Sequence, residues 1–248
     1  MLKNIFFSFI ILFTLSLTLE AKSIEAKFDV SYGILGKIGT ANALLEKEKN
    51  SYKINIDLVA TGLAKYVSRG RKEQHISTGH MEQGLMVSDV YQVIKSYGNT
   101  KMQKEYHIDH TKKQVRKIYK KFKKGKLVAK EDTILDFYSK DDLLTLYFNL
   151  DRAIADKRSA KTYTFKAIGA ENQKGKVTVI IPKEKQRHKY IEVLGKDVAW
   201  YATAIIHQKI FSSKEGRLML GVDEDGITNQ AVLKDVIFFG DIRAKRVD

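Results

Sequence analysis

The stretch Tyr52–Leu58 (YKINIDL) sets the expectation for the fold. Its apolar residues, Tyr52, Ile54, Ile56 and Leu58, are separated by single polar residues. Successive side chains of a β-strand point to opposite faces, so this period of two places all four on one face. The stretch therefore predicts a strand with one buried face and one face toward water, which is typical of an antiparallel sheet.

Similar patterns recur along most of the chain. Turn signals such as Lys124-Gly125-Lys126 and Asp223-Glu224-Asp225-Gly226 separate them, and no linker rich in Pro, Gly or Ser divides the chain. About a dozen strands predict one mainly β domain over residues 22–248, a strongly curved antiparallel sheet or open barrel. Besides 52–58, the predicted strands are Ile24–Ile34, Thr40–Glu48, Glu73–Thr78, Leu85–Ser96, Lys101–His110, Gln114–Phe122, Lys126–Thr133, Thr162–Ile168, Lys176–Ile181, His188–Leu194, Val198–Lys209, Arg217–Val222 and Ala231–Ala244.

One principal helix is predicted over Lys140–Ala155. Ser139 is in place to cap it, and Asp141 and Asp142 lie where carboxylates suit the helix dipole. Its apolar residues cover more than one stripe, so we expect it against the sheet or inside the curve of the sheet. Residues Ala60–Ser68 fit either a short helix or an irregular crossing, and the pattern does not choose between them.

The N-terminus carries the features of a secretory signal peptide. Ile5–Leu19 (IFFSFIILFTLSLTL) is an apolar run directly behind Lys3. It is shorter than the ~20 residues that a spanning helix needs. We therefore expect residues 1–21 to be removed, the mature protein to begin near Lys22, and its location to be the periplasm of a Gram-negative bacterium. The alternative is an uncleaved signal that anchors the chain in the inner membrane.

Composition narrows the chemistry and the partners. The chain has no cysteine, which excludes disulfides and thiol nucleophiles. Its net charge is +15, and residues 101–130 contain twelve basic residues against only Glu105 and Asp109. An exported protein meets little nucleic acid, so we expect no nucleic-acid partner. The expected partners of this positive region are lipid headgroups or other anionic envelope polymers. The candidate contacts are Lys117, Lys120, Lys121, Lys123 and Lys124.

A structural alternative accounts for the same lysines. A solvated, lysine-rich hairpin keeps a protein soluble and protects a sheet edge from pairing with another chain. The aromatic residues also have two interpretations. They either form an ordinary core or line an apolar cavity for an acyl chain. The residues concerned are Tyr147, Phe148, Trp200 and Phe238.

Catalytic and metal motifs are sparse. No G-x-S-x-G elbow and no H-E-x-x-H helix occurs. The tightest histidine group is His107-Ile108-Asp109-His110. On a strand His107 and Asp109 share a face and His110 points away, so the three do not converge. We therefore assign no catalytic residue, no metal ligand and no cofactor, and we expect a non-catalytic protein.

Three segments carry a family resemblance. They are Asp136–Phe148 (DFYSKDDLLTLYF), Arg217–Asp225 (RLMLGVDED) with Phe239–Ile242 (FGDI), and Phe28–Gly33 (FDVSYG) with Gly36–Gly39 (GKIG). Together they resemble the helix, the terminal strand with its acidic turn, and the opening strand pair of the domain-of-unknown-function 3108 family. The resemblance implies an exported β-rich domain of Gram-negative bacteria with no assigned activity, and it supplies no catalytic residues.

These observations predict a periplasmic binding or envelope-maintenance module with affinity for lipid or another anionic component. Two alternatives stay open. One is an envelope hydrolase whose site is assembled only in three dimensions. The other is a structural partner in an envelope complex, which would expose an apolar patch or an uncovered strand edge. The sequence leaves the oligomeric state open.

Overall fold

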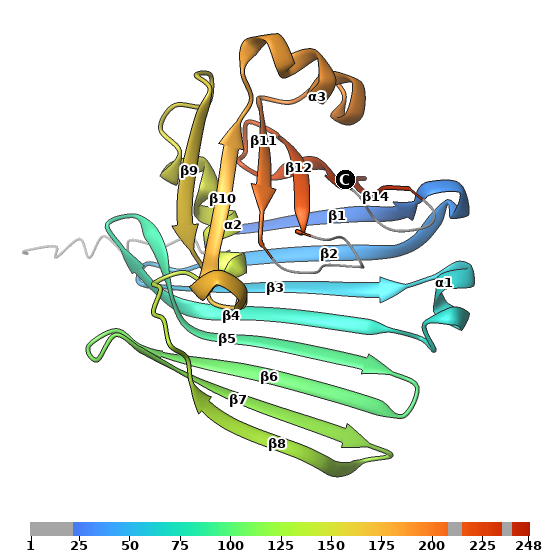
Figure 1. Cartoon of the computed structure of the whole chain (residues 1–248), viewed down its shortest axis with the longest axis vertical. Helices are drawn as coiled ribbons and strands as arrows, with labels where there is room; N and C mark the ends of the chain where they lie inside the picture. Colours follow the sequence, from blue (N-terminus) through green and yellow to red (C-terminus); the bar gives the residue numbers. More distant parts are fainter. Residues whose placement is uncertain (1–21, 208–214, 235–239) are drawn as a thin grey trace, which may run out of the picture.

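A computed structural model describes residues 22–207, 215–234 and 240–248 of the chain (Figure 1). In these residues, fourteen strands form one antiparallel sheet in the order β8-β7-β6-β5-β4-β3-β2-β1-β14-β13-β12-β11-β10-β9. The end strands β8 and β9 are not paired, so the sheet curves without closing. This confirms the predicted fold class. The strands are β1 (Lys22–Tyr32), β2 (Lys37–Lys47), β3 (Ser51–Ala60), β4 (Lys72–Glu82), β5 (Leu85–Tyr97), β6 (Thr100–Asp109), β7 (Gln114–Lys123), β8 (Lys126–Ile134), β9 (Lys161–Lys166), β10 (Lys176–Ile181), β11 (Trp200–Ile205), β12 (Arg217–Val222), β13 (Thr228–Leu233) and β14 (Ile242–Arg246).

Helices occupy little of the described chain. In Figure 1, β1–β8 run across the view and β9–β12 run at a steep angle to them. Helix α2 lies between the two groups of strands. Of the helices in the described residues, none has the length and hydropathy that crossing a membrane requires. The α-helices are α1 (Gly62–Val67), α2 (Leu143–Ala153) and α3 (Arg187–Leu194), and the short 3₁₀ helices are η1 (Gly33–Leu35), η2 (Asn172–Gly175) and η3 (Glu184–Gln186).

Helix α2 joins the two parts of the core. Leu144 packs with buried residues of β3, β5 and β6. Leu146 and Leu150 pack with buried residues of β10, β11 and β12. The helix therefore buries apolar side chains on two sides, which is why its sequence is apolar beyond a single stripe.

The start of α2 differs from the prediction. The N-cap is Asp142, whose Oδ1 accepts hydrogen bonds from the backbone N–H groups of Leu144 at 2.7 Å and Thr145 at 3.0 Å. Ser139, the predicted cap, instead donates its hydroxyl to the backbone oxygen of Lys166 at 2.6 Å. Tertiary contacts decide which residue caps the helix, because Asp142 is completely buried against the sheet.

The predicted strand His188–Leu194 is wrong, because these residues form most of α3. Tyr190, Val193 and Leu194 have the spacing of one helix face and pack against buried Tyr201 and Val232. The predicted strand Ala231–Ala244 is also wrong as one element. It contains the end of β13 and the start of β14, and residues 235–239 lie outside the described residues. The strand predicted over Val198–Lys209 is shorter, since β11 ends at Ile205.

The β7–β8 hairpin is confirmed, although Val115, Ile118, Tyr119 and Phe122 have helical spacing. Its two-residue turn has positive φ at both Lys124 (49°) and Gly125 (75°). Positive φ at both central residues is the geometry that matches the twist of paired strands. The undecided segment Ala60–Ser68 contains α1, a helix of six residues that buries none of them.

Candidate functional site

Three chain reversals meet at one end of β3–β8 (Figure 1). The backbone N–H of Gly98, in the β5–β6 turn, donates to the oxygen of Arg69 at 2.8 Å, just after α1. The N–H of Lys124, in the β7–β8 turn, donates to the oxygen of Asn99 at 2.8 Å. These bonds connect segments that are far apart in sequence. We call residues 62–71, 98–101 and 120–126 the basic rim.

The basic rim carries only positive charge. Its three segments contain nine Lys or Arg residues and no Asp or Glu. Among the described acidic side chains, none forms an ion pair with Lys120, Lys121, Lys123 or Lys124. Cross-strand neighbours also carry like charge, since Lys120 faces Lys130 and Lys123 faces Lys126. Facing like charges destabilise a hairpin, so an anionic partner would relieve repulsion here.

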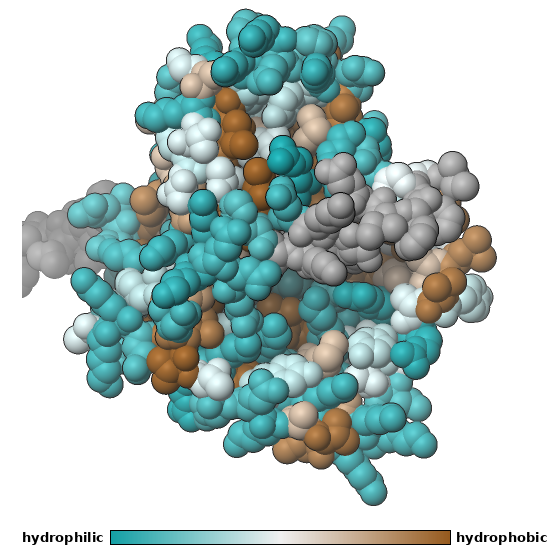
Figure 2. All heavy atoms as spheres, in the orientation of Figure 1, coloured by the Kyte–Doolittle hydropathy of each residue, from teal (hydrophilic) through white to brown (hydrophobic). Residues whose placement is uncertain are grey.

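Exposed apolar side chains accompany this charge. Leu63, Tyr66 and Val67 of α1 are 73%, 81% and 87% exposed. In Figure 2, hydrophobic atoms are visible at the edge of the molecule where Figure 1 places α1. Leu127 and Val128, just beyond the rim on β8, are more than half exposed. A group of exposed apolar side chains is more typical of an interaction surface than of a surface that only contacts water.

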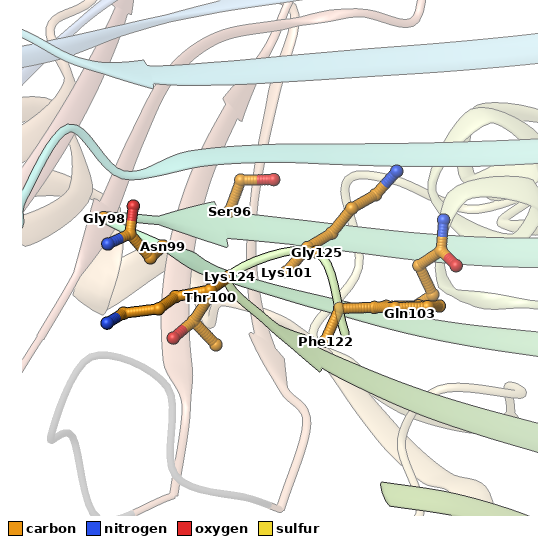
Figure 3. A pocket seen from close by; sticks show the side chains of 9 residues that line it. All are labelled: Ser96, Gly98, Asn99, Thr100, Lys101, Gln103, Phe122, Lys124 and Gly125. Atoms are coloured by element: carbon orange, nitrogen blue, oxygen red, sulfur yellow. The ribbon is translucent and has the colours of Figure 1, made fainter. Parts of the chain in front are cut away.

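A depression of about 550 Å³ opens between the hairpin turns (Figure 3). Lys101 of β6 pairs with Phe122 of β7. Lys101 is an odd number of residues from buried Tyr106 on the same strand, and Phe122 is an odd number from buried Val115, so both point to the outer face of the sheet. The depression is therefore on the face of the sheet opposite to α2. Lys101 and Lys124 in its lining suit a small anionic group. The lining residues are Ser96, Gly98, Asn99, Thr100, Lys101, Gln103, Phe122, Lys124 and Gly125.

Four of the five predicted lysine contacts lie together, and Lys117 lies apart. Lys120 and Lys121 point to opposite faces near the end of β7, and Lys123 and Lys124 reach the turn. The Lys117 side chain is largely covered, and its ammonium lies 2.5 Å from Glu171 Oε2. Glu171 also accepts a 2.6 Å hydrogen bond from the Tyr106 hydroxyl.

The charge of Lys117 is thus neutralised inside the fold. Burial disfavours the charged form of Glu171, but hydrogen bonds from Lys117 and Tyr106 and the charge of Lys104 outweigh it. The pKa of Glu171 is lowered to about 2. Alternation along the strand places Lys117 and Lys120 on opposite faces of the sheet. The sequence pattern does not tell which of the two faces is covered by the rest of the protein.

The predicted aromatic residues lie in packed clusters. Trp200 is buried among side chains of β10, β11 and β12, and its Nε1–H donates to Asp151 Oδ1 at 3.1 Å. Tyr147 and Phe148 meet edge to face with ring centres 4.9 Å apart. The Tyr147 hydroxyl accepts a hydrogen bond from the backbone N–H of Thr228 at 3.1 Å. Phe238 lies outside the described residues.

Polar residues on the inner face of β4 were missed from the sequence. Buried Glu73 lies beside Lys95, Arg71 and His75. Burial opposes its charge, but the hydrogen bond with His75 and the charges of Lys95 and Arg71 prevail, so the pKa of Glu73 is lowered to about 2. A signal was present in the sequence, because β4 (KEQHISTGHME) is polar on both faces. A half-buried strand with two polar faces indicates polar groups in the interior.

The histidines do not gather as a local group. His107 Nε2 lies 2.5 Å from Glu105 Oε1 on the same strand. His110 lies beside His80 and Asp89, which come from β4 and β5. Sequence spacing gave no indication of this group, because its members are separated by up to thirty residues.

No protein-family model matches the sequence, and no curated protein matches it. Among solved structures, the chain is similar to a β-barrel-like protein of Domain of Unknown Function DUF1849 from Brucella abortus. The identity is 14%, the TM-score is 0.50, and the match covers 92% of this chain and 96% of that one. At this identity the similarity shows the fold alone, a mostly β, barrel-like sheet.

The resemblance to the domain-of-unknown-function 3108 family is therefore corrected. Its family model does not match, and the structural neighbour belongs to a different domain of unknown function. The segments that carried the resemblance are a helix start, a strand with an acidic turn and a hairpin. Alternation and turn chemistry impose such residues on many antiparallel sheets, so they do not identify a family.

Proposed function

We propose that the protein is a non-catalytic cell-envelope module that binds anionic lipid surfaces through the basic rim. The observation that carries the proposal is that lysines with no ion pair among the described residues and exposed apolar side chains lie at one end of the sheet. Lys123 and Lys124 lie at the tip of the β7–β8 hairpin, and Leu63, Tyr66 and Val67 are exposed on α1, which the β5–β6 turn separates from that tip.

The two kinds of side chain support different parts of the binding energy. Each basic residue near an anionic bilayer contributes about 1 kcal/mol, and the effect decays within a Debye length of about 8 Å at physiological salt. The apolar side chains of α1 supply a term that salt does not screen. Tyr66 suits the interface particularly well, because tyrosine combines an apolar ring with a polar tip.

Export would bring the rim into contact with such surfaces. The signal peptide predicted over residues 1–21 would deliver the protein to the periplasm, where anionic headgroups and polymers are the principal negative partners. The depression beside Lys101 and Lys124 would then receive a single headgroup. This binding mode needs neither a cofactor nor a catalytic group.

A second candidate, a structural partner in an envelope complex, rests on the open edge of the sheet. None of the nine residues of β8 is buried, and its outer edge has no neighbouring strand in the described part of the chain. Such an edge can accept a strand from another protein. Lys126 and Lys130 oppose this, because lysines on an edge strand discourage pairing. The lipid-binding proposal is therefore favoured.

Co-sedimentation with vesicles tests the proposal. We expect the full chain to bind vesicles that contain phosphatidylglycerol more tightly than vesicles of phosphatidylcholine. About 1 M salt should remove most of this preference, because the Debye length falls to about 3 Å. A rim variant should lose the preference by at least about tenfold. It carries Lys→Gln substitutions at Lys120, Lys121, Lys123 and Lys124.

A control variant removes the same charge elsewhere and should bind as the wild type does. It carries Lys→Gln substitutions at four exposed positions in and around α3, namely Lys183, Lys185, Lys189 and Lys196. All proteins in the comparison share the same N-terminal segment, so differences report the lysines alone. Equal binding to both kinds of vesicle, or equal losses in the two variants, would refute the proposal.

A further inference from the structure

We propose that His80, Asp89 and His110 bind a divalent transition-metal ion of the zinc class. His80 lies on β4, Asp89 on β5, and His110 directly follows β6. His80 Nδ1 lies 3.0 Å from Asp89 Oδ1, and His110 Nε2 lies 3.1 Å from the same oxygen. One ligand atom from each residue falls within 4.8 Å of the other two.

Two of the three separations between ligand atoms, those that involve Asp89, are close to the separations in a metal site. Zinc binds imidazole nitrogen and carboxylate oxygen at about 2.0–2.2 Å, so neighbouring ligands in a tetrahedral site are about 3.3 Å apart. Both distances to Asp89 are close to that value. Two imidazoles and one carboxylate form a donor set for zinc and its transition-metal neighbours, whereas calcium and magnesium prefer oxygen alone.

A β-bulge places Asp89 in this group. Thr78 pairs with Val90 and Gly79 pairs with Ser88, so Asp89 is the extra residue on β5. A bulge leaves one residue out of the ladder and redirects its side chain. Gly79 permits the close approach, because a Cβ there would lie 2.0 Å from the backbone oxygen of Val87. The backbone is therefore arranged to bring the Asp89 carboxylate beside His80.

An outer partner orients His110. Its second ring nitrogen, Nδ1, lies 2.8 Å from the Tyr138 hydroxyl, and the two rings meet edge to face. Histidines that bind metals usually direct the second nitrogen to such a partner, which fixes the ring and the tautomer. The rings of His80 and His110 are also edge to face, with centres 5.5 Å apart. These contacts orient both rings, and a bound ion would replace the hydrogen on His110 Nε2, which also lies 3.0 Å from the backbone oxygen of Ser88.

The site is accessible and separate from the basic rim. The side chains of His80, Asp89 and His110 are 43%, 42% and 25% exposed. An ion held by three protein ligands would keep a coordination position for water. Lys72, the first residue of β4, directly follows the basic rim. His80 is eight residues further along the same strand, a distance of about 25 Å at the usual rise per residue. The metal proposal therefore does not depend on lipid binding.

Calorimetric titration with ZnCl₂ tests the proposal on the full chain, produced without an affinity tag and stripped of metal with a chelator. We expect one equivalent of Zn²⁺ to bind. His80→Ala, Asp89→Asn and His110→Ala should each weaken binding at least tenfold. Tyr138→Phe should weaken it about tenfold through loss of the orienting hydroxyl. His107→Ala, which removes an exposed histidine of β6, should leave the affinity unchanged.

Titration with Co²⁺ supplies a second, spectroscopic measurement, made on variants whose circular dichroism matches that of the wild type. We expect absorption bands of Co²⁺ bound by nitrogen and oxygen ligands in the wild type and in His107→Ala. The bands should be absent in the double variant His80→Ala/His110→Ala. Lack of saturable binding by the wild type, or wild-type affinity in the double variant, would overturn the proposal.

Discussion

Ser77 donates its hydroxyl hydrogen to Asp142 Oδ2 over 2.5 Å, and this buried bond connects the middle of the sheet to the start of α2. The Thr145 hydroxyl donates to the same oxygen at 3.0 Å. Thr145 is also 2.8 Å from the Tyr52 hydroxyl on β3. The cap of the helix is therefore part of the contact between helix and sheet, and loss of one carboxylate affects both.

Asp142→Ala should lower the free energy of unfolding by about 3 kcal/mol, because it removes an N-cap and leaves buried hydroxyls without their acceptor. Urea unfolding followed by the fluorescence of Trp200, the single tryptophan, measures this. The matched control is Asp136→Ala, whose side chain is 73% exposed and should cost less than about 0.5 kcal/mol. Equal losses in the two variants would contradict the role assigned to Asp142.

Glu171 should make stability depend on acid pH. Its pKa is lowered to about 2 in the folded protein from an ordinary 4.5. A lowered carboxyl pKa stabilises the fold above pH 4.5, and this contribution disappears as the pH falls through 2. Its size is on the order of 3 kcal/mol.

Glu171→Gln should therefore be destabilised at pH 6 and approach the wild type near pH 2. Denaturation at a series of pH values measures the difference. Glu184→Gln, at an exposed position, should retain the pH dependence of the wild type. A constant difference between Glu171→Gln and the wild type at every pH would show that the carboxylate charge is not involved.

Gly79→Ala should destabilise the protein by more than about 2 kcal/mol, because the added Cβ would overlap the backbone oxygen of Val87. Gly221→Ala is a suitable comparison, since the nearest atom to its Cβ would be Val198 Cγ1 at 3.2 Å, on a side chain that can adjust. Thermal unfolding of both variants measures the difference. Similar melting temperatures would mean that the bulge at Asp89 tolerates a side chain.

The α1 side chains should determine the part of lipid binding that resists salt. Replacing Leu63, Tyr66 and Val67 by serine should leave the preference for anionic vesicles intact and reduce the binding that remains in about 1 M salt severalfold. Because α1 buries none of its residues, the variant should keep the stability of the wild type. Unchanged binding in high salt would exclude insertion of this helix.

Export should be visible in the mass of the protein. We expect expression of the full chain in a Gram-negative host to yield a periplasmic product that begins near Lys22. N-terminal sequencing and intact mass measure this directly. A full-length product in the membrane fraction would support the anchored alternative, and a full-length product in the cytosol would contradict export.

Local patterns were sufficient for most of the sheet. Alternation as in Tyr52–Leu58 and turn residues such as Lys124-Gly125 depend on neighbours in sequence, so strands and hairpins could be predicted from them. The strand predicted over His188–Leu194 was wrong, because so short a segment fits both the period of a strand and the period of a helix. Packing against Tyr201 and Val232 decided for the helix.

The sequence by itself determined an antiparallel β protein with one apolar helix, without cysteine, and with its positive charge concentrated in residues 101–130. These properties come from residues close together in the chain. Only the tertiary structure decided that Lys117 is neutralised by Glu171, that the β5–β6 turn connects the end of α1 to the lysine-rich turn, and that His80, Asp89 and His110 meet. Strand register and a bulge create those contacts, and register depends on the packing of the whole sheet.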